Sequence, residues 1–333
     1  MTGKEVVRRA IEFKNPARLP VRFGYFGMDD TFYLKWNQII GVDENSRQSY
    51  DEWGCLWERS EQDNMGQVKG HPLLDWDDLK NYKFPDPNHP SLYSGMEEQY
   101  RENAEGKYVF FEIFMLLFER LHSLRGFNNV LMDLYLEPEK IAYLADRIVE
   151  YNLEIIRNID QRFHGRIDGF YCTDDWGTEL NTFISLDMWN DFFKPRYKKI
   201  FDACKKAGWH VWLHSCGKVN NFIDGFIDVG VDVLNLQQPR VLGIEEIGKK
   251  YAGKVCFATL CDIQHTLPFK SNEEITEEAR LLLDCWATDS GGFILMDDGN
   301  GEALGIPDSK RKAMLDAFLK YDPFRKRQGG SYE

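Results

Sequence analysis

The chain lacks an excess of basic residues, a CxxC pair and any long apolar run. Its 333 residues include 41 Lys and Arg against 54 Asp and Glu, which gives a formal net charge of -13. This balance argues against a nucleic-acid binder or a protein held on an anionic membrane, because both need basic patches. No stretch is apolar enough to span a bilayer, and the first five residues contain no apolar signal core. We therefore expect neither a nucleic-acid partner nor a membrane partner.

Cysteine is scattered along the chain and shows no pairing pattern. The seven cysteines are an odd number without motif spacing, which is typical of a reducing, cytoplasmic compartment. A glycine-rich phosphate-binding turn is also missing after every apolar segment. This absence weakens a dinucleotide-binding open sheet as the architecture.

The sequence does contain a repeated alternation of short apolar segments with amphipathic ones. Seven or eight apolar segments are typical of buried strands, and most precede an expected helix. The clearest strands are expected at 167–172, 209–213, 231–236, 255–260 and 291–296. The alternation and the chain length predict a (β/α)8 barrel, with a doubly wound open sheet as the competing architecture. We expect a single domain over residues 1–333.

Residues 31–107 are less regular than the rest of the chain. They are rich in Trp, Asp and Pro, for example at 75–78 and 84–87. Long irregular segments inside a domain are often functional. We predict an insertion or lid-like region here, with a packed structural excursion as an equally weighted alternative.

Polar side chains follow almost every expected strand. In a barrel the carboxyl ends of the strands meet at one rim, where active sites lie. Such an accumulation of polar groups predicts that this rim is the functional face. The candidates for contact with a small-molecule substrate are Asp29, Trp176, Gln237, Gln238 and Asp262.

Asp174 and Asp175 stand side by side after the strand expected at 167–172. Adjacent carboxylates repel each other, which can raise the pKa of one of them and suit it to acid or base catalysis. We predict both as catalytic residues. The alternative is that Asp174 caps a turn and Asp175 is solvated.

His214 and Cys216 end the apolar run 209–213, and Gly217 lets the chain turn after them. Residues two apart in a strand point to the same side. An imidazole and a thiol are good zinc ligands, and both are candidates for acid/base or nucleophilic chemistry. We predict His214 as a catalytic residue and, with Cys216, as a metal ligand. A hydrogen-bonded structural histidine is the alternative, and two ligands alone do not complete a metal site.

The order and spacing of several motifs resemble the uroporphyrinogen decarboxylase superfamily. These motifs lie at 173–179, 183–189, 193–200, 213–217, 230–235, 261–264 and 291–295. The chain is most similar to the methyltransferase-like branch, with methylcobalamin:coenzyme M methyltransferases and corrinoid-dependent O-demethylase components. The resemblance implies a (β/α)8 barrel that transfers a methyl group between a corrinoid and a small acceptor. The corrinoid would be a free substrate or would belong to a partner protein.

The region after the first expected strand departs from the decarboxylase pattern. The decarboxylases carry an arginine-rich motif there, whereas this chain reads Phe23 to Asp30 and ends in an acidic pair. Carboxylates would repel a polycarboxylate porphyrinogen, which arginines would bind. We therefore do not expect decarboxylation of uroporphyrinogen. Two alternatives to methyl transfer stay open: a metal-free lyase for another small acid, and a non-catalytic subunit that docks a corrinoid protein through Trp53, Trp57 and Trp76.

The expected zinc site departs from the family pattern as well. The resemblance to the methyltransferases implies a zinc site of the pattern His-x-Cys…Cys. In this chain the turn expected to hold the last Cys, residues 297–300, has the sequence Asp-Asp-Gly-Asn. Carboxylates also serve as zinc ligands in catalytic sites. We therefore expect Asp298 or Cys261 to complete the site of His214 and Cys216. A homodimer is a further expectation.

Overall fold

Eight parallel strands surround the centre of the molecule in a computed structural model, which describes residues 1–39, 46–59, 65–297, 301 and 303–325. Around the barrel they are β1 (Val21–Phe23), β12 (Phe293–Met296), β11 (Cys256–Thr259), β10 (Val233–Asn235), β9 (His210–His214), β8 (Gly169–Thr173), β7 (Tyr108–Ile113) and β3 (Thr31–Tyr33). The short β2 (Met28–Asp29) pairs with β1 and is separated from β3 by Asp30 alone, so the barrel is nearly closed. The predicted (β/α)8 barrel is confirmed.

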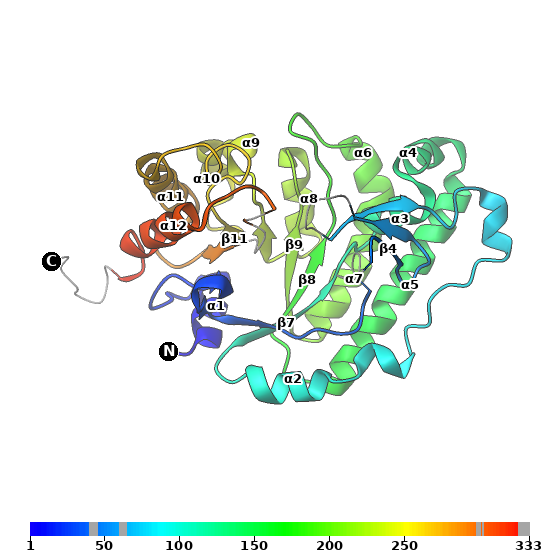
Figure 1. The fold of residues 1–333 in the computed structure, drawn as a ribbon, viewed down its shortest axis with the longest axis horizontal. Coiled ribbons are helices and arrows are strands. Elements are labelled where there is room, and N and C mark those ends of the chain that lie inside the picture. Colours follow the sequence, from blue (N-terminus) through cyan, green and yellow to red (C-terminus); the bar gives the residue numbers. More distant parts are fainter. Residues whose placement is uncertain (40–45, 60–64, 298–300, 302, 326–333) are drawn as a thin grey trace.

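Helices cover the outside of the barrel (Figure 1). They are α1 (Gly3–Ile11), α2 (Met96–Asn103), α3 (Phe118–Arg125), α4 (Phe127–Leu136), α5 (Pro138–Phe163), α6 (Leu186–Met188), α7 (Lys194–Lys206), α8 (Ile223–Asp228), α9 (Pro239–Leu242), α10 (Ile244–Tyr251), α11 (Asn272–Trp286) and α12 (Asp308–Lys320). None of the described helices is long and apolar enough to cross a membrane.

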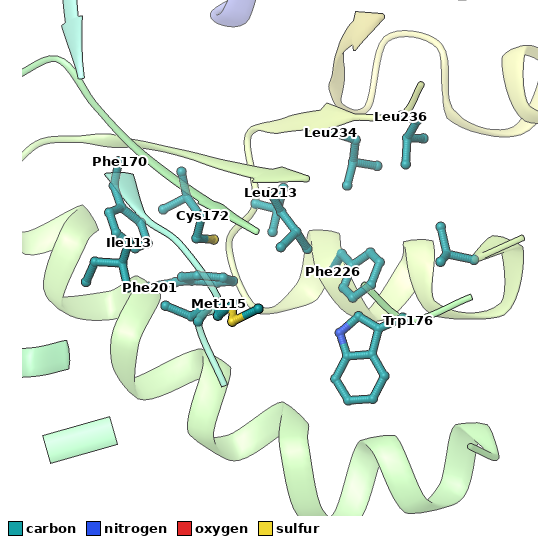
Figure 2. Close-up of a cluster of buried hydrophobic side chains, with 14 of the residues drawn as sticks. Ile113, Met115, Phe170, Cys172, Trp176, Phe201, Leu213, Phe226, Leu234 and Leu236 are labelled. Carbon is teal, nitrogen blue, oxygen red and sulfur yellow. The ribbon is translucent and has the colours of Figure 1, made fainter. Parts of the chain in front are cut away.

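Side chains of the strands alternate between the barrel interior and the helices, as the two-residue period of a strand requires. The interior is a buried cluster that includes Tyr108, Phe110, Tyr171, Trp212, Ala258, Ile294 and Met296. Figure 2 shows the opposite faces, where Cys172 and Leu213 point toward Phe201 and Phe226 of the surrounding helices. This alternation decides which strand residues can reach the site at the end of the barrel.

Helix α1 covers the end of the barrel where the strands begin. Thr2 caps the helix, and Val7, Ala10 and Ile11 join the interior cluster. The carbonyl of Ala10 accepts a hydrogen bond from the backbone of Gly292, just before β12, at 2.8 Å. Figure 1 shows α1 and α2 at the lower end of the strands and α4 and α6 at the upper end. A site inside the barrel is therefore accessible only from the ends where the strands finish.

The irregular region is shorter than predicted, because Thr31–Tyr33 pairs with β7 as a barrel strand. Further along the chain, a three-stranded antiparallel sheet forms from β4 (Gln48–Tyr50), β5 (Leu56–Glu58) and β6 (Gln67–Gly70). Trp53 and Trp57 are buried, so they cannot supply the predicted contact surface. Trp76 is partly buried beneath the guanidinium of Arg125. These contacts favour the packed excursion over a lid.

Candidate metal centre

Three ligand atoms meet where β8 and β9 end. The side chains of Asp175, His214 and Cys216 each offer one ligand atom, and these atoms lie within 4.8 Å of one another. The Nε2 atom of His214 is 3.4 Å from Cys216 Sγ and 3.7 Å from Asp175 Oδ1. Ligand atoms around a tetrahedral zinc ion lie about 3.3–3.6 Å apart, as bond lengths of 2.0–2.3 Å require. The distance from His214 to Cys216 falls in this range and that to Asp175 lies just above it, so the three side chains are close enough to hold a single ion.

Two glycines allow the loops after β8 and β9 to touch. Gly217 has a φ of 78°, a backbone conformation that favours glycine. A Cβ atom at Gly217 would lie 2.3 Å from the carbonyl carbon of Gly177. At this contact the backbone N–H of Cys216 donates to Asp175 Oδ1 at 2.8 Å. The glycines thus bring the carboxylate of one loop beside the thiol of the other.

Asn235 at the end of β10 determines which ring nitrogen of His214 is free. The side-chain Nδ2 of Asn235 donates to the carbonyl of Ala258 at 2.7 Å, so its Oδ1 faces His214. That oxygen lies 2.8 Å from His214 Nδ1 and also accepts a hydrogen bond from Tyr171. Because Oδ1 can only accept, Nδ1 carries the proton, and Nε2 presents its lone pair to Asp175 and Cys216. Orientation by a hydrogen bond of this kind is typical of metal-binding histidines.

The Cys216 thiol lies in a negatively charged environment. Burial raises the pKa of Cys216, and the nearby carboxylate of Asp175 raises it further through its charge and a hydrogen bond. The thiol therefore stays protonated unless a cation offsets the surrounding negative charge. A bound metal ion would supply that charge.

Asp174 has a structural position, in contrast to the neighbouring Asp175. It is fully buried, and its carboxylate accepts hydrogen bonds from the backbone N–H groups of Leu117, Phe118 and Glu119 at 2.7–3.0 Å. Tyr197 donates a further hydrogen bond. Burial raises the pKa of Asp174 to about 6, whereas these hydrogen bonds act to lower it. Asp174 thus caps α3, the alternative to its predicted catalytic role, and cannot touch a substrate.

Glu119 is a site residue that the sequence pattern did not indicate. It lies in the first turn of α3, and its carboxyl accepts a hydrogen bond from the Thr173 hydroxyl at 2.9 Å. Burial raises its pKa well above 4.5, and the charges of Asp175 and Asp174 raise it further. The only signal in the sequence was an acidic residue at the end of an apolar run. This run continues from β7 into α3, so the sequence does not show where the helix that positions Glu119 begins.

A family model described as "Uroporphyrinogen decarboxylase (URO-D)" matches residues 111–321. The chain belongs to the URO-D family. A comparison with curated proteins finds no match.

The barrel resembles solved structures of low sequence identity. A methyltransferase from Methanosarcina mazei is 14% identical, with a TM-score of 0.61 over 89% of this chain and 81% of the other. A 2,3-dimethylmalate lyase is 14% identical, with a TM-score of 0.40 over 95% and 87% of the two chains. A type I 3-dehydroquinate dehydratase from Clostridium difficile is 13% identical, with a TM-score of 0.37 over 71% and 78%. The first of these matches shows a shared fold.

Several residues predicted to contact substrate hold the URO-D barrel together. Trp176 is buried in the cluster of Figure 2, with its ring stacked on Phe118 at 4.3 Å. Gln238 is also buried and accepts a hydrogen bond from the backbone of Gly217 at 2.6 Å. Gln238 thereby supports the turn after Cys216. The partly exposed Gln237 accepts a backbone hydrogen bond from Ile263, so its predicted substrate contact stays a prediction.

Two residues that follow β11 face away from the metal centre. Cys261 is fully buried, and its thiol donates to the carbonyl of Ile275 in α11 at 3.5 Å. Its prediction as a metal ligand is wrong, because the side chain lies among the outer helices. Asp262 is also fully buried, and its carboxylate accepts hydrogen bonds from the backbones of Arg240, Gln264 and His265. With its carboxylate engaged in this turn, Asp262 cannot contact a substrate as predicted.

Two candidates remain, Asp29 and Asp298. Asp29 accepts hydrogen bonds from the backbone and hydroxyl of Thr31, at 2.9 and 2.7 Å. It lines an open cleft of about 340 Å³ together with Arg18 and Leu319 of α12, and its substrate contact stays a prediction. Asp298 lies outside the described residues. Among the described residues, the group that could hold a metal ion contains Asp175 beside His214 and Cys216, where we expected Asp298 or Cys261.

Proposed function

We propose that this URO-D family protein is a methyltransferase that moves a methyl group between a corrinoid and a small acceptor, with zinc held by Asp175, His214 and Cys216. The observation that carries the proposal is the convergence of three donor atoms on one point, with the lone pair of His214 directed there by Asn235. Fold similarity to a methyltransferase supports it.

The donor set fits a catalytic zinc ion. Imidazole, thiolate and carboxylate are all zinc ligands, and three protein ligands leave the fourth position for a substrate. Zinc bound there would lower the pKa of a thiol or water in that position and make it a nucleophile near neutral pH. The three side chains are partly exposed, so a small molecule can reach them from the end of the barrel.

The residues around this centre have separate roles in the proposed mechanism. Asn235 keeps the proton on Nδ1 of His214, and the backbone of Cys216 holds the Asp175 carboxylate in place. Glu119 lies within electrostatic range of Asp175 and Cys216, and its raised pKa suits it to donate a proton. The corrinoid would be a free substrate or be carried by a partner protein.

A metal-free lyase is the second candidate function. The specific observation that favours it is the buried Glu119 within electrostatic range of the partly exposed Asp175, since two carboxyls in different environments can act as an acid/base pair. Such an enzyme would act on a small acid without zinc.

Two cysteine variants separate these functions. Cys216 lies in the ligand cluster, whereas Cys261 is a buried cysteine on the outer face of the barrel. We expect about one zinc per chain in the wild type and in Cys261→Ser, and loss of zinc in Cys216→Ser. Zinc is measured by elemental analysis of protein purified without added metal, and the melting temperature of each variant checks its folding. A metal-free wild type, or equal zinc in both variants, contradicts the zinc site.

Methyl transfer is measured on the same preparations. Methylcobalamin is the donor, 2-mercaptoethanol is the acceptor probe, and loss of the methyl–cobalt absorbance is the signal. We expect turnover by the wild type and by Cys261→Ser, and none by Cys216→Ser. A zinc-loaded protein without turnover, but with a stable corrinoid-protein complex, would instead indicate a docking subunit. A zinc-free protein that releases carbon dioxide from a small acid would indicate the lyase.

A further inference from the structure

Arg22 enters the barrel from β1. Its neighbours in the strand, Val21 and Phe23, belong to the core between the strands and the outer helices. Arg22 pairs in register with Met296 of β12, which is a residue of the interior cluster. Since side chains alternate along a strand, the guanidinium points into the barrel. It lies near the end of the barrel that α1 leaves open.

The surroundings of the Arg22 side chain differ from those of three buried arginines of the chain. Its Cζ atom is 5.1 Å from the ring centre of Phe110 and 5.9 Å from that of Tyr171. Within the described part of the chain, the Arg22 side chain makes no hydrogen bond and no ion pair. Three buried arginines each bind a carboxylate, in the pairs Arg120–Asp51, Arg125–Asp133 and Arg311–Asp297. Aromatic rings thus hold the Arg22 guanidinium in place while its donors stay available.

The metal centre lies on the opposite wall of the same opening. Three strands separate β1 from β9 in one direction around the barrel, and three separate them in the other. Tyr171, which lies under Arg22, donates to the same Asn235 oxygen that faces His214. The partly exposed Glu112 carboxyl lies within electrostatic range of both Arg22 and His214. Arg22 and the metal centre therefore face one shared space.

We propose that Arg22 binds the oxyanion group of a small substrate whose reacting end lies at Asp175, His214 and Cys216. A guanidinium binds carboxylate, sulfonate and phosphate through paired hydrogen bonds, so the shared ligand chemistry is a small oxyanion. The role of the reacting end rests on the proposed function, whereas the anion site does not. A positive group at this point would also draw an anion into a protein whose net charge is -13.

The Glu112 carboxyl does not neutralise Arg22 by direct contact. The Glu112 carboxyl forms no ion pair with Arg22 in the described structure, and burial works against its ionisation. A bound oxyanion would therefore be the direct partner of the guanidinium. A neutral analogue of the substrate would leave Arg22 unpaired, so this residue selects for acids over their amides and alcohols.

The test uses metal-free protein, so that it does not depend on the zinc proposal. Arg22→Met removes the charge and keeps an apolar stem over Phe110 and Tyr171. Arg147→Met on α5 is the matched control, because Arg147 also stacks on a ring, that of Phe84, but is exposed outside the barrel. Binding of acetate, methanesulfonate and phosphate is measured by titration calorimetry at constant ionic strength, with acetamide as the neutral probe. Melting temperatures check that both variants fold.

We expect at least one of the three anions to bind the wild type and Arg147→Met, and acetamide to bind neither. In Arg22→Met the dissociation constant should rise about tenfold or more, the loss typical of a charge-assisted hydrogen bond. The anion that binds most tightly identifies the class of acid. Failure of all three anions to bind the wild type, or unchanged binding in a folded Arg22→Met, would overturn the inference. If the protein as purified contains no zinc and the wild type still binds an anion, this inference stands and the proposed function is removed.

Discussion

Removal of the Asn235 side-chain oxygen should weaken metal binding although Asn235 is not a ligand. In the folded protein this oxygen accepts hydrogen bonds from Nδ1–H of His214 and from the hydroxyl of Tyr171, and the Nδ2 group of Asn235 donates one to the carbonyl of Ala258. In Asn235→Leu the imidazole can place its proton on either nitrogen and can rotate. Loss of such a supporting hydrogen bond typically lowers metal affinity 10–100-fold, or about 1.4–2.7 kcal/mol.

The same substitution should lower the stability of the metal-free protein. It leaves the Nδ1–H of His214 and the hydroxyl of Tyr171 without their acceptor, so we expect a loss of roughly 2–4 kcal/mol in the free energy of unfolding. Asn152→Leu is the matched control, because Asn152 is a buried asparagine on α5 whose amide donates to a single carbonyl, that of Leu116. This control should cost about 1–2 kcal/mol and leave zinc affinity unchanged.

Competition with a chromophoric chelator gives the zinc affinity, and urea unfolding gives the stability. Asn235→Asp separates the two effects, because a carboxylate still accepts from His214 and Tyr171 but cannot donate to Ala258. We expect it to lose stability while its zinc affinity stays close to that of the wild type. The reasoning is refuted if Asn235→Leu binds zinc as tightly as Asn152→Leu does.

Three further predictions concern the loops and acids of the site. Gly217→Ala should lower the free energy of unfolding by more than about 2 kcal/mol, because the new Cβ would lie 2.3 Å from Gly177. Gly208→Ala is the control: its φ is 84° and nothing lies within 4 Å, so it should lower this free energy by only about 1 kcal/mol. Equal losses in urea unfolding would contradict the contact. Asp174→Ala should lose roughly 2–4 kcal/mol, because three buried N–H groups of α3 lose their acceptor, while Asp175→Ala should lose zinc with little change in unfolding. Glu119 holds its proton in the folded state at pH values where the unfolded chain has released it, so wild-type stability should fall as the pH rises above 4.5, the ordinary pKa of a glutamate. Glu119→Gln cannot titrate, so its free energy of unfolding should rise relative to the wild type over that range, and a constant difference would show that the Glu119 pKa is not raised.

The barrel could be predicted because its signal is local and repeated. Short apolar runs that alternate with amphipathic ones specify strands and helices, and local signals such as the capping box of Ser271 and Glu274 mark where a helix such as α11 begins. The end of a strand is hard to predict where an apolar run continues beyond it. Residues 109–117 are apolar and strand-like at their start, and the structure ends β7 at Ile113 and begins α3 at Phe118. Burial on all sides removes the periodicity that would separate such a strand from such a helix.

The sequence alone determined the barrel and the pairing of His214 with Cys216, because strand geometry places residues two apart on one side. It did not determine the third ligand. The sequence predicted Asp175 as a catalytic residue, but only the contact between Gly177 and Gly217 brings its carboxylate beside the thiol of Cys216. The tertiary structure also decided that Asp174 caps a helix, that Cys261 faces the outer helices, and that β1, which carries Arg22, lies across the barrel from β9. These relations depend on distances between strands that are far apart in the chain, and no local pattern encodes such distances.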